Sequence, residues 1–172
     1  MKKFILFFSA GIFASFLSIN YGFSQPSDGG TPPSFTYKSV ISNTFDERNI
    51  QSIDVNQALH DDSLKGGPVW AGRSVPVGLN MLTAGTWTDL PDGRKVWRLK
   101  LTSTGAKAIV VCYDDFYIPE GGKLFLYNEL QTQVIGAYTS KNNPASRIFS
   151  TEMIQGESVT LEYIAPVDLP TK

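Results

Sequence analysis

The sequence has very little of two residues on which many functional sites depend. It contains one cysteine and one histidine among 172 residues. A single cysteine excludes an intrachain disulfide and a cysteine-rich zinc site. The formal net charge is −1, so charge gives no reason to expect nucleic acid or an anionic membrane as a partner. The length suits one domain with a modest core, and 12% aromatic residues are typical of a globular chain.

The N-terminus has the pattern of a secretory signal peptide. Two lysines precede an almost wholly apolar run over residues 4–19, and the small residues Gly22 and Ser24 stand at the usual positions before a cleavage site ahead of Gln25. The alternative is a membrane anchor, but the run is shorter than the roughly 20 residues of a span, and no basic stop-transfer cluster follows. We therefore expect residues 1–24 to be removed. The chain would be periplasmic, extracellular or on the cell surface, without membrane contact after cleavage.

A leader and one helix are expected before the main domain. Residues 25–53 begin with many prolines and glycines, which predicts a flexible leader, with a possible short strand over 35–40. Residues 54–65 have the pattern of a short helix, with Asp54 as its N-cap. The glycines that start at Gly66 would end it.

The residues from 69 onward predict β-structure. Short apolar segments alternate with turn residues about every ten positions, which is typical of a β-sandwich or barrel. The expected fold class is all-β, an antiparallel β-sandwich of jelly-roll-like kind with one short N-terminal helix. Its domain would cover 54–166, and 167–172 would be a linker toward a missing downstream domain. Outside the central pair, the expected strands cover residues 75–81, 85–90, 123–128, 133–138, 148–153 and 158–164.

The central pair of strands is expected around a turn at Gly105. In the first strand, apolar residues from Trp97 to Leu101 alternate with Arg98 and Lys100, which predicts one buried and one wet face. The second, residues 108–113, is continuously apolar, which predicts a strand covered on both faces. The side chains expected in the core are Trp97, Leu99, Leu101, Val110, Leu124, Leu126, Val159 and Leu161. Arg98 should lie on the opposite, wet face, with Glu162 on a neighbouring strand as its expected partner, and the pair would be worth roughly 0–1 kcal/mol if exposed.

The search for catalytic chemistry gives no site. The sole histidine, His60, stands beside two aspartates in the expected helix, so a solvated surface role is favoured. Cys112 lies in an apolar strand, where a buried and inert thiol is expected. Asp114 and Asp115 are adjacent and would point to opposite faces, which argues against an acid–base dyad. With Glu120 they are weak candidates for a calcium site, although a polar strand end explains them better. We expect no cofactor.

An ordered series of short segments gives a family resemblance. The segments are GTW at 85–87, VWRL at 96–99, PEGGKLFLYN at 119–128, GAYT at 136–139 and LE at 161–162. This order resembles the N-terminal, non-catalytic region of secreted trypsin-like serine proteases of the lysyl endopeptidase type. The resemblance covers about residues 54–166. It implies a β-rich pro-region or accessory domain, whose partner is the cognate protease domain and whose role is folding aid, inhibitor or binding module.

The protease domain itself is absent from this sequence, so the resemblance transfers no catalytic residue. The chain is expected to be either a truncated form or a stand-alone descendant of the pro-region. A protease partner predicts exposed aromatic residues outside the core, and the candidates are Phe35, Tyr37, Trp70, Phe116 and Tyr117. The alternative is a stand-alone surface module that binds glycan or protein. A glycan module predicts a tryptophan, Trp70 or Trp87, on an open polar groove.

Overall fold

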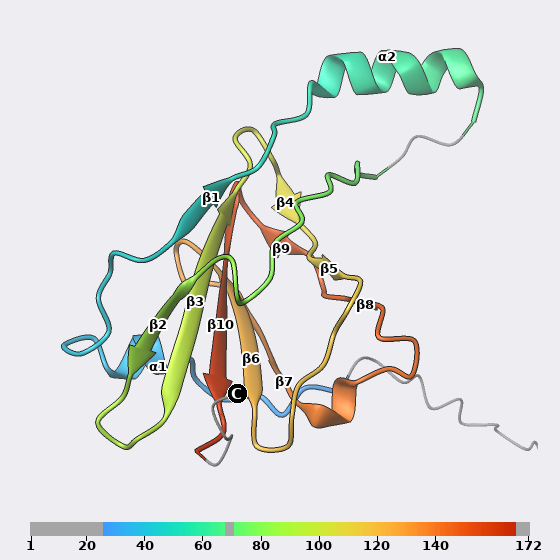
Figure 1. The fold of residues 1–172 in the computed structure, drawn as a ribbon. Helices are drawn as coiled ribbons and strands as arrows, with labels where there is room; N and C mark the ends of the chain where they lie inside the picture. The colour runs from blue at the N-terminus through green and yellow to red at the C-terminus, as the bar shows by residue number, and fades with distance from the viewer. Residues whose placement is uncertain (1–25, 68–70, 168–172) are drawn as a thin grey trace, which may run out of the picture.

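The computed structural model describes residues 26–67 and 71–167 (Figure 1). The expected signal peptide, Trp70 and most of the expected linker lie outside these residues. The main element of the described part is a six-stranded sheet of order β1-β3-β10-β6-β7, with β2 also paired to β3. Its strands are β1 (Glu47–Asn49), β2 (Thr86–Asp89), β3 (Lys95–Thr102), β6 (Lys123–Asn128), β7 (Val134–Tyr138) and β10 (Ser158–Ala165).

The long strand β10 lies between β3 and β6 and is antiparallel to both. The expected strands at 85–90, 123–128, 133–138 and 158–164 are confirmed with small shifts at their ends. One edge differs from the expected antiparallel pattern, because β1 pairs with β3 in parallel. Residues 26–53 thus contribute a strand, and Ile41 of this segment is buried, so the leader packs on the sheet instead of lying apart from it.

The central pair expected between β3 and residues 108–113 is wrong. These residues form two short strands, β4 (Ala108–Ile109) and β5 (Cys112–Tyr113), which pair with β9 (Ile154–Gln155) and β8 (Phe149–Ser150). We call these two pairs the outer ribbons. Only alternate residues pack on the core, so Val110 is 45% exposed and the Cys112 thiol is exposed. The run is therefore half-buried, although its composition is apolar throughout.

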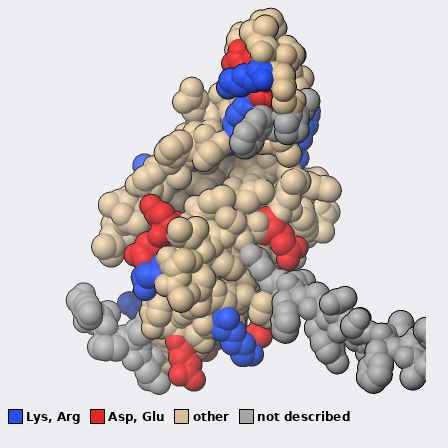
Figure 2. Space-filling view, turned by 90° about the vertical axis from the view of Figure 1, so that its right-hand side faces the viewer, with Lys and Arg blue, Asp and Glu red and all other residues tan. Residues whose placement is uncertain are grey.

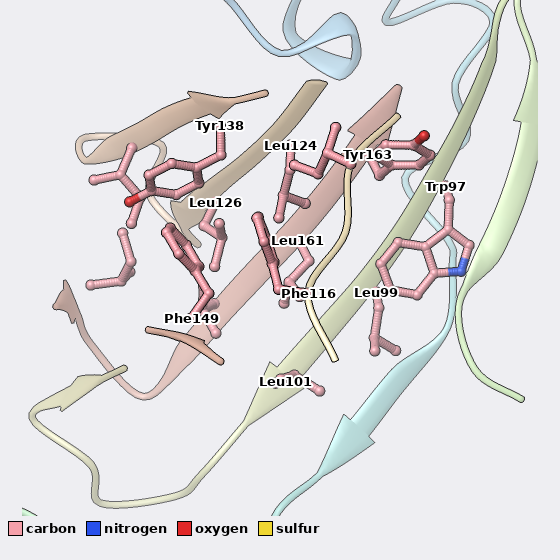
Figure 3. Close-up of a cluster of buried hydrophobic side chains, with 14 of the residues drawn as sticks. Trp97, Leu99, Leu101, Phe116, Leu124, Leu126, Tyr138, Phe149, Leu161 and Tyr163 are labelled. Carbon is pink, nitrogen blue, oxygen red and sulfur yellow. The ribbon is translucent and has the colours of Figure 1, made fainter. Parts of the chain in front are cut away.

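Two clusters of apolar side chains cover the two faces of the sheet. The first lies between the sheet and the outer ribbons; in Figure 3 the side chains of β3, β6 and β10 point toward Phe116 and Phe149. All the expected core residues except Val110 are buried. The second cluster lies on the opposite face, which we call the second face, and contains Ile41, Leu90, Val96, Phe125, Ala137 and Ile164.

The helix expected at 54–65 is confirmed as α2 (Val55–Lys65), which stands away from the sheet in Figure 1. The Asp54 carboxylate accepts a hydrogen bond from the Gln57 amide at 3.0 Å, and Gly66 ends the helix in the left-handed conformation. The strand expected over 35–40 is wrong, because a one-turn helix, α1 (Pro33–Thr36), occupies its start. A proline at the first helical position favours this turn.

The remaining expected strands are only partly formed. Residues 75–81 form no strand: Pro76 lacks an amide donor, and Gly78 has a φ of 55°, which breaks the extended backbone. Of residues 148–153 only β8 is a strand, and a short 3₁₀ helix, η1 (Ser140–Asn142), precedes it. The fold is mainly β, as expected, and its sheets are open. No helix in the described residues is both long and apolar enough to span a bilayer.

Trp97 gives the clearest stability test of this core. Its ring is buried, and its indole Nε1 donates to the Ala84 carbonyl at 2.8 Å. We expect Trp97→Ala to lower the free energy of unfolding by about 3–5 kcal/mol in denaturant melts, because a large cavity remains. Val110→Ala is the control and should cost less than about 1 kcal/mol, since Val110 is partly solvated. Equal losses for the two variants would contradict the observed burial.

Candidate functional site: a polar groove on the second face

A segment of the N-terminal region crosses the second face of the sheet. We call residues 28–45 the strap. At one end, the Asp28 amide donates to the Ala137 carbonyl at 3.0 Å, and the Ala137 amide donates to Gly29 at 3.4 Å. Just beyond the other end, the Asp46 amide donates to the Thr86 hydroxyl at 2.9 Å. The strap is thus fixed to β7 on one side of the sheet and to β2 on the other.

The middle of the strap is held by a buried carboxylate. Glu162, on β10, is fully buried. It accepts hydrogen bonds from the Ser34 amide at 2.8 Å, the Ser34 hydroxyl at 2.5 Å and the Tyr127 hydroxyl at 2.8 Å. The turn of α1 presents both donors of Ser34 to the sheet, because Ser34 lies in its first positions. A buried charge is tolerated where several donors satisfy it, and Glu162 meets this condition.

Arg98 lies next to Glu162 but does not share its hydrogen bonds. The two residues are direct partners on β3 and β10, which confirms the expected neighbouring strands. The expected exposure of the pair is wrong, since the strap buries both. The guanidinium Nη2 donates to the Ser42 carbonyl at 2.7 Å, and its carbon lies 4.2 Å from the centre of the Phe45 ring. Burial lowers the pKa of Arg98, while nearby Tyr127 and Glu162 oppose this effect.

A groove of about 510 Å³ opens between the strap and the sheet beside Arg98. The strap contributes Asn43, Thr44 and Phe45, and the sheet contributes Arg98 and Lys100 from β3 as well as side chains of β6 and β10. Its lining is therefore mainly polar.

The groove carries charges of both signs. The Lys100 ammonium lies 3.6 Å from the Glu47 carboxylate and 3.2 Å from that of Glu129. Two carboxylates and one ammonium leave these three side chains with one net negative charge, and Arg98 is the remaining lining cation. The groove is suited to hold a polar ligand.

The described groove residues include no histidine or cysteine. Ser34 is bonded to the Glu162 carboxylate, but His60 lies exposed on α2, away from the groove. Cys112 lies on β5 and accepts a hydrogen bond from the Ser150 hydroxyl at 3.2 Å, so the expected burial of this thiol is wrong. The residues that a serine or cysteine hydrolase would need together are therefore apart in the described structure.

The five expected partner-binding residues have different positions. Phe116 is buried and stacked on Phe149 at 4.2 Å, so its expected exposure is wrong; the reason is that it points into the first core. Phe35 of the strap packs edge-on against Tyr127 of β6, and Tyr37 of the strap packs on the second core cluster. Tyr117 is exposed beside Arg147. Trp70 lies outside the described residues.

The weak calcium candidates do not form a cluster. Asp114, Asp115 and Glu120 are exposed, and Asp115 forms an ion pair with Arg147. Within residues 26–67 and 71–167 there is no group of three or more His, Cys, Asp or Glu side chains placed to hold a metal ion. Trp87, the other candidate for sugar stacking, is partly exposed but shares the register of Trp97, so it lies on the face opposite the groove.

Sequence reasoning found part of this site. Arg98 was recognisable as a charged residue inside an apolar alternation, and Glu162 as its neighbour. Ser34 was missed because a serine in a proline-rich segment carries no signal for a partner 128 residues away. No protein-family model matches the chain, and no solved structure matches it.

The Ser34–Glu162 contact can be tested by substitution. Ser34→Ala removes the hydroxyl that donates to Glu162. We expect a loss of about 1–3 kcal/mol in the free energy of unfolding, because a hydrogen bond to a buried charge is lost. Faster hydrogen exchange at the strap amides should accompany it. Ser63→Ala, which removes an exposed hydroxyl on α2, is the control, and an equal loss there would refute a special role for Ser34.

Asp46 gives a pH test of the strap's attachment. The Gly85 amide donates to its carboxylate at 2.6 Å and, with Arg48, lowers the pKa of Asp46. The unfolded chain therefore binds the proton more readily, so this stabilisation is present above the ordinary pKa and is lost as pH falls through the lower folded value. Asp46→Asn should flatten the fall in unfolding free energy between about pH 5 and about pH 2. Asp114→Asn is the control, and an identical flattening would contradict the assignment.

Proposed function

We propose that this chain is an exported, non-catalytic β-domain that binds a serine protease of the lysyl endopeptidase type, as its pro-region or accessory domain. The placement of the resembling segments supports this. VWRL lies in β3, KLFLYN is β6 and LE lies in β10, and these three strands are neighbours in one sheet. The resembling segments thus form the three neighbouring central strands of one sheet. We further infer a sandwich-like architecture, in which the outer ribbons act as the second layer.

The apolar outer side of the ribbons is the observation that carries the proposal. Met153 is 55% exposed and Ile148 is 67% exposed, and Val110 and Tyr117 are also solvent-accessible. Figure 2 views the molecule from the side of the ribbons, and charged groups there are small and separate, with uncharged surface between them.

One backbone hydrogen bond brings together the two links that carry Val110 and Met153. The Thr151 amide donates to the Val111 carbonyl at 3.0 Å. The residues that connect β4 to β5 therefore lie beside those that connect β8 to β9. Val110 and Met153 belong to these two links. A surface of this kind suits a folded protein partner, for which about 800 Å² per partner is the usual contact.

Inhibition is the direct test. The chain, purified after export, is mixed with the catalytic domain of a lysine-specific trypsin-like protease, and hydrolysis of a lysyl substrate is followed. We expect inhibition at micromolar concentration or below. Replacing Ile148 and Met153 together by Asp should weaken it at least tenfold, because charges would be buried at the interface. Leu64→Asp on α2, also highly exposed, is the matched control.

Two results would contradict the proposal. One is the absence of both inhibition and improved refolding of the protease at micromolar concentration. The other is an equal loss of binding for the Leu64 variant, which would mean that the ribbon side chains have no particular role.

The polar groove favours a second candidate, a surface module that binds glycan. Its volume of about 510 Å³ and its hydroxyl and amide lining suit a small saccharide. Isothermal titration calorimetry with soluble oligosaccharides tests this candidate. A saturable heat of binding together with no effect on the protease would favour it over the protease partner.

A further inference from the structure

The buried guanidinium of Arg98 has fewer partners than its charge requires. The residue is 3% exposed, and its Nε has no hydrogen-bond acceptor within the described residues. Its Nη2 donates to a neutral carbonyl, that of Ser42, and nearby Tyr127 and Glu162 favour the charged form without giving Nε an acceptor. A buried cation is costly unless an anion and several acceptors compensate it. The strap and sheet together leave this compensation incomplete.

The nearby carboxylates are already engaged. Glu162 accepts three hydrogen bonds from Ser34 and Tyr127, and although it lies near Arg98 it supplies no acceptor to the Arg98 Nε. Glu47 and Glu129 both pair with Lys100. An anion that compensates the Arg98 charge more fully therefore has to come from a bound molecule. Arg98 lines the groove, so a ligand in the groove can reach it.

We propose that the groove seats a carboxylate of a peptide segment, an Asp or Glu side chain or a chain end, on Arg98. This deepens the proposed function and rests on it, since the segment would belong to the protein partner. A guanidinium matches a carboxylate in shape and can bind both of its oxygens. The one net negative charge that Glu47, Glu129 and Lys100 leave in the groove opposes any anion, and it opposes a phosphate more than a carboxylate because a phosphate carries more charge.

The aromatic rings of the groove favour a peptide over an acidic sugar. Sugar rings in binding sites commonly stack on a free aromatic face. Here Phe45 already lies against the Arg98 guanidinium, and Tyr127 packs edge-on against Phe35 at 4.9 Å. Asn43, Thr44 and Gln131 offer amide and hydroxyl groups that can hydrogen-bond a peptide backbone as well as a sugar, so the occupied aromatic faces are what favour the peptide.

Binding of short peptides tests this without the protease. The probes are acetyl-Gly-Glu-Gly-amide and the same peptide with Gln, added to the ¹⁵N-labelled exported chain. The readout is the Arg98 Nε–H signal in NMR spectra. This signal reports binding at the Arg98 guanidinium in the unmodified protein. We expect a saturable shift with the Glu peptide and binding at least tenfold weaker with the Gln peptide.

Variants sharpen the assignment. Arg98→Lys keeps the charge but loses the planar fork, and it should weaken the Glu peptide at least tenfold. Arg147→Gln removes an exposed arginine beside Tyr117, outside the groove, and should leave binding unchanged. Saturation of the Arg98 signal in the unmodified chain keeps the test decisive if a substituted chain does not fold.

Three outcomes would overturn the inference. These are equal binding of the Glu and Gln peptides, no saturable shift up to millimolar peptide, and saturation by a glucuronate disaccharide where the peptides give none. If the protease is still inhibited in any of these cases, the proposed function stands and only the carboxylate seat is refuted. If the Glu peptide binds as expected but the protease is neither bound nor refolded, the proposed function is refuted and the carboxylate seat stands.

Discussion

Pairing of β10 with β3 and β6 along nearly its whole length is the constraint on which the other features depend. Because β10 lies between two strands, its backbone polar groups are satisfied within the sheet, and both of its faces are available for burial. One face carries Val159, Leu161 and Tyr163 into the first core. The other carries Thr160 and Glu162, and these polar groups need partners of their own.

The strap supplies several of these partners, and Tyr127 of β6 supplies another. Ser34 and Tyr127 satisfy Glu162, and the carbonyl of Ser42 takes one donor of Arg98. The same coverage encloses Arg98 and shapes the groove beside it. The polar network and the groove are thus two results of one arrangement, in which a polypeptide segment lies over charged residues in the centre of a sheet.

Features set by neighbouring residues were predictable from the sequence. The cap at Asp54 and the ending at Gly66 depend on contacts within one helix, and the alternation around Trp97 depends on one strand. Residues 108–113 were misread because a continuous apolar run looks the same whether one face or two are covered.

The strap and the groove were not predictable from local pattern, because they depend on residues far apart in the chain. The one-turn helix at Pro33 and the contact between Ser34 and Glu162 become visible only when the sheet is assembled. Arg98 was placed on the correct strand and the correct face, but its burial follows from the strap and not from its own segment.

The contact between Ser34 and Glu162 also has a consequence for folding. It joins residues 128 positions apart, and β10 is the last strand of the described part of the chain. During synthesis the strap emerges early and has no sheet to cover until β10 is complete. Contacts this distant in sequence form slowly, because a long loop must close first. The strap can therefore be fixed over Glu162 only after β10 has been added to the sheet.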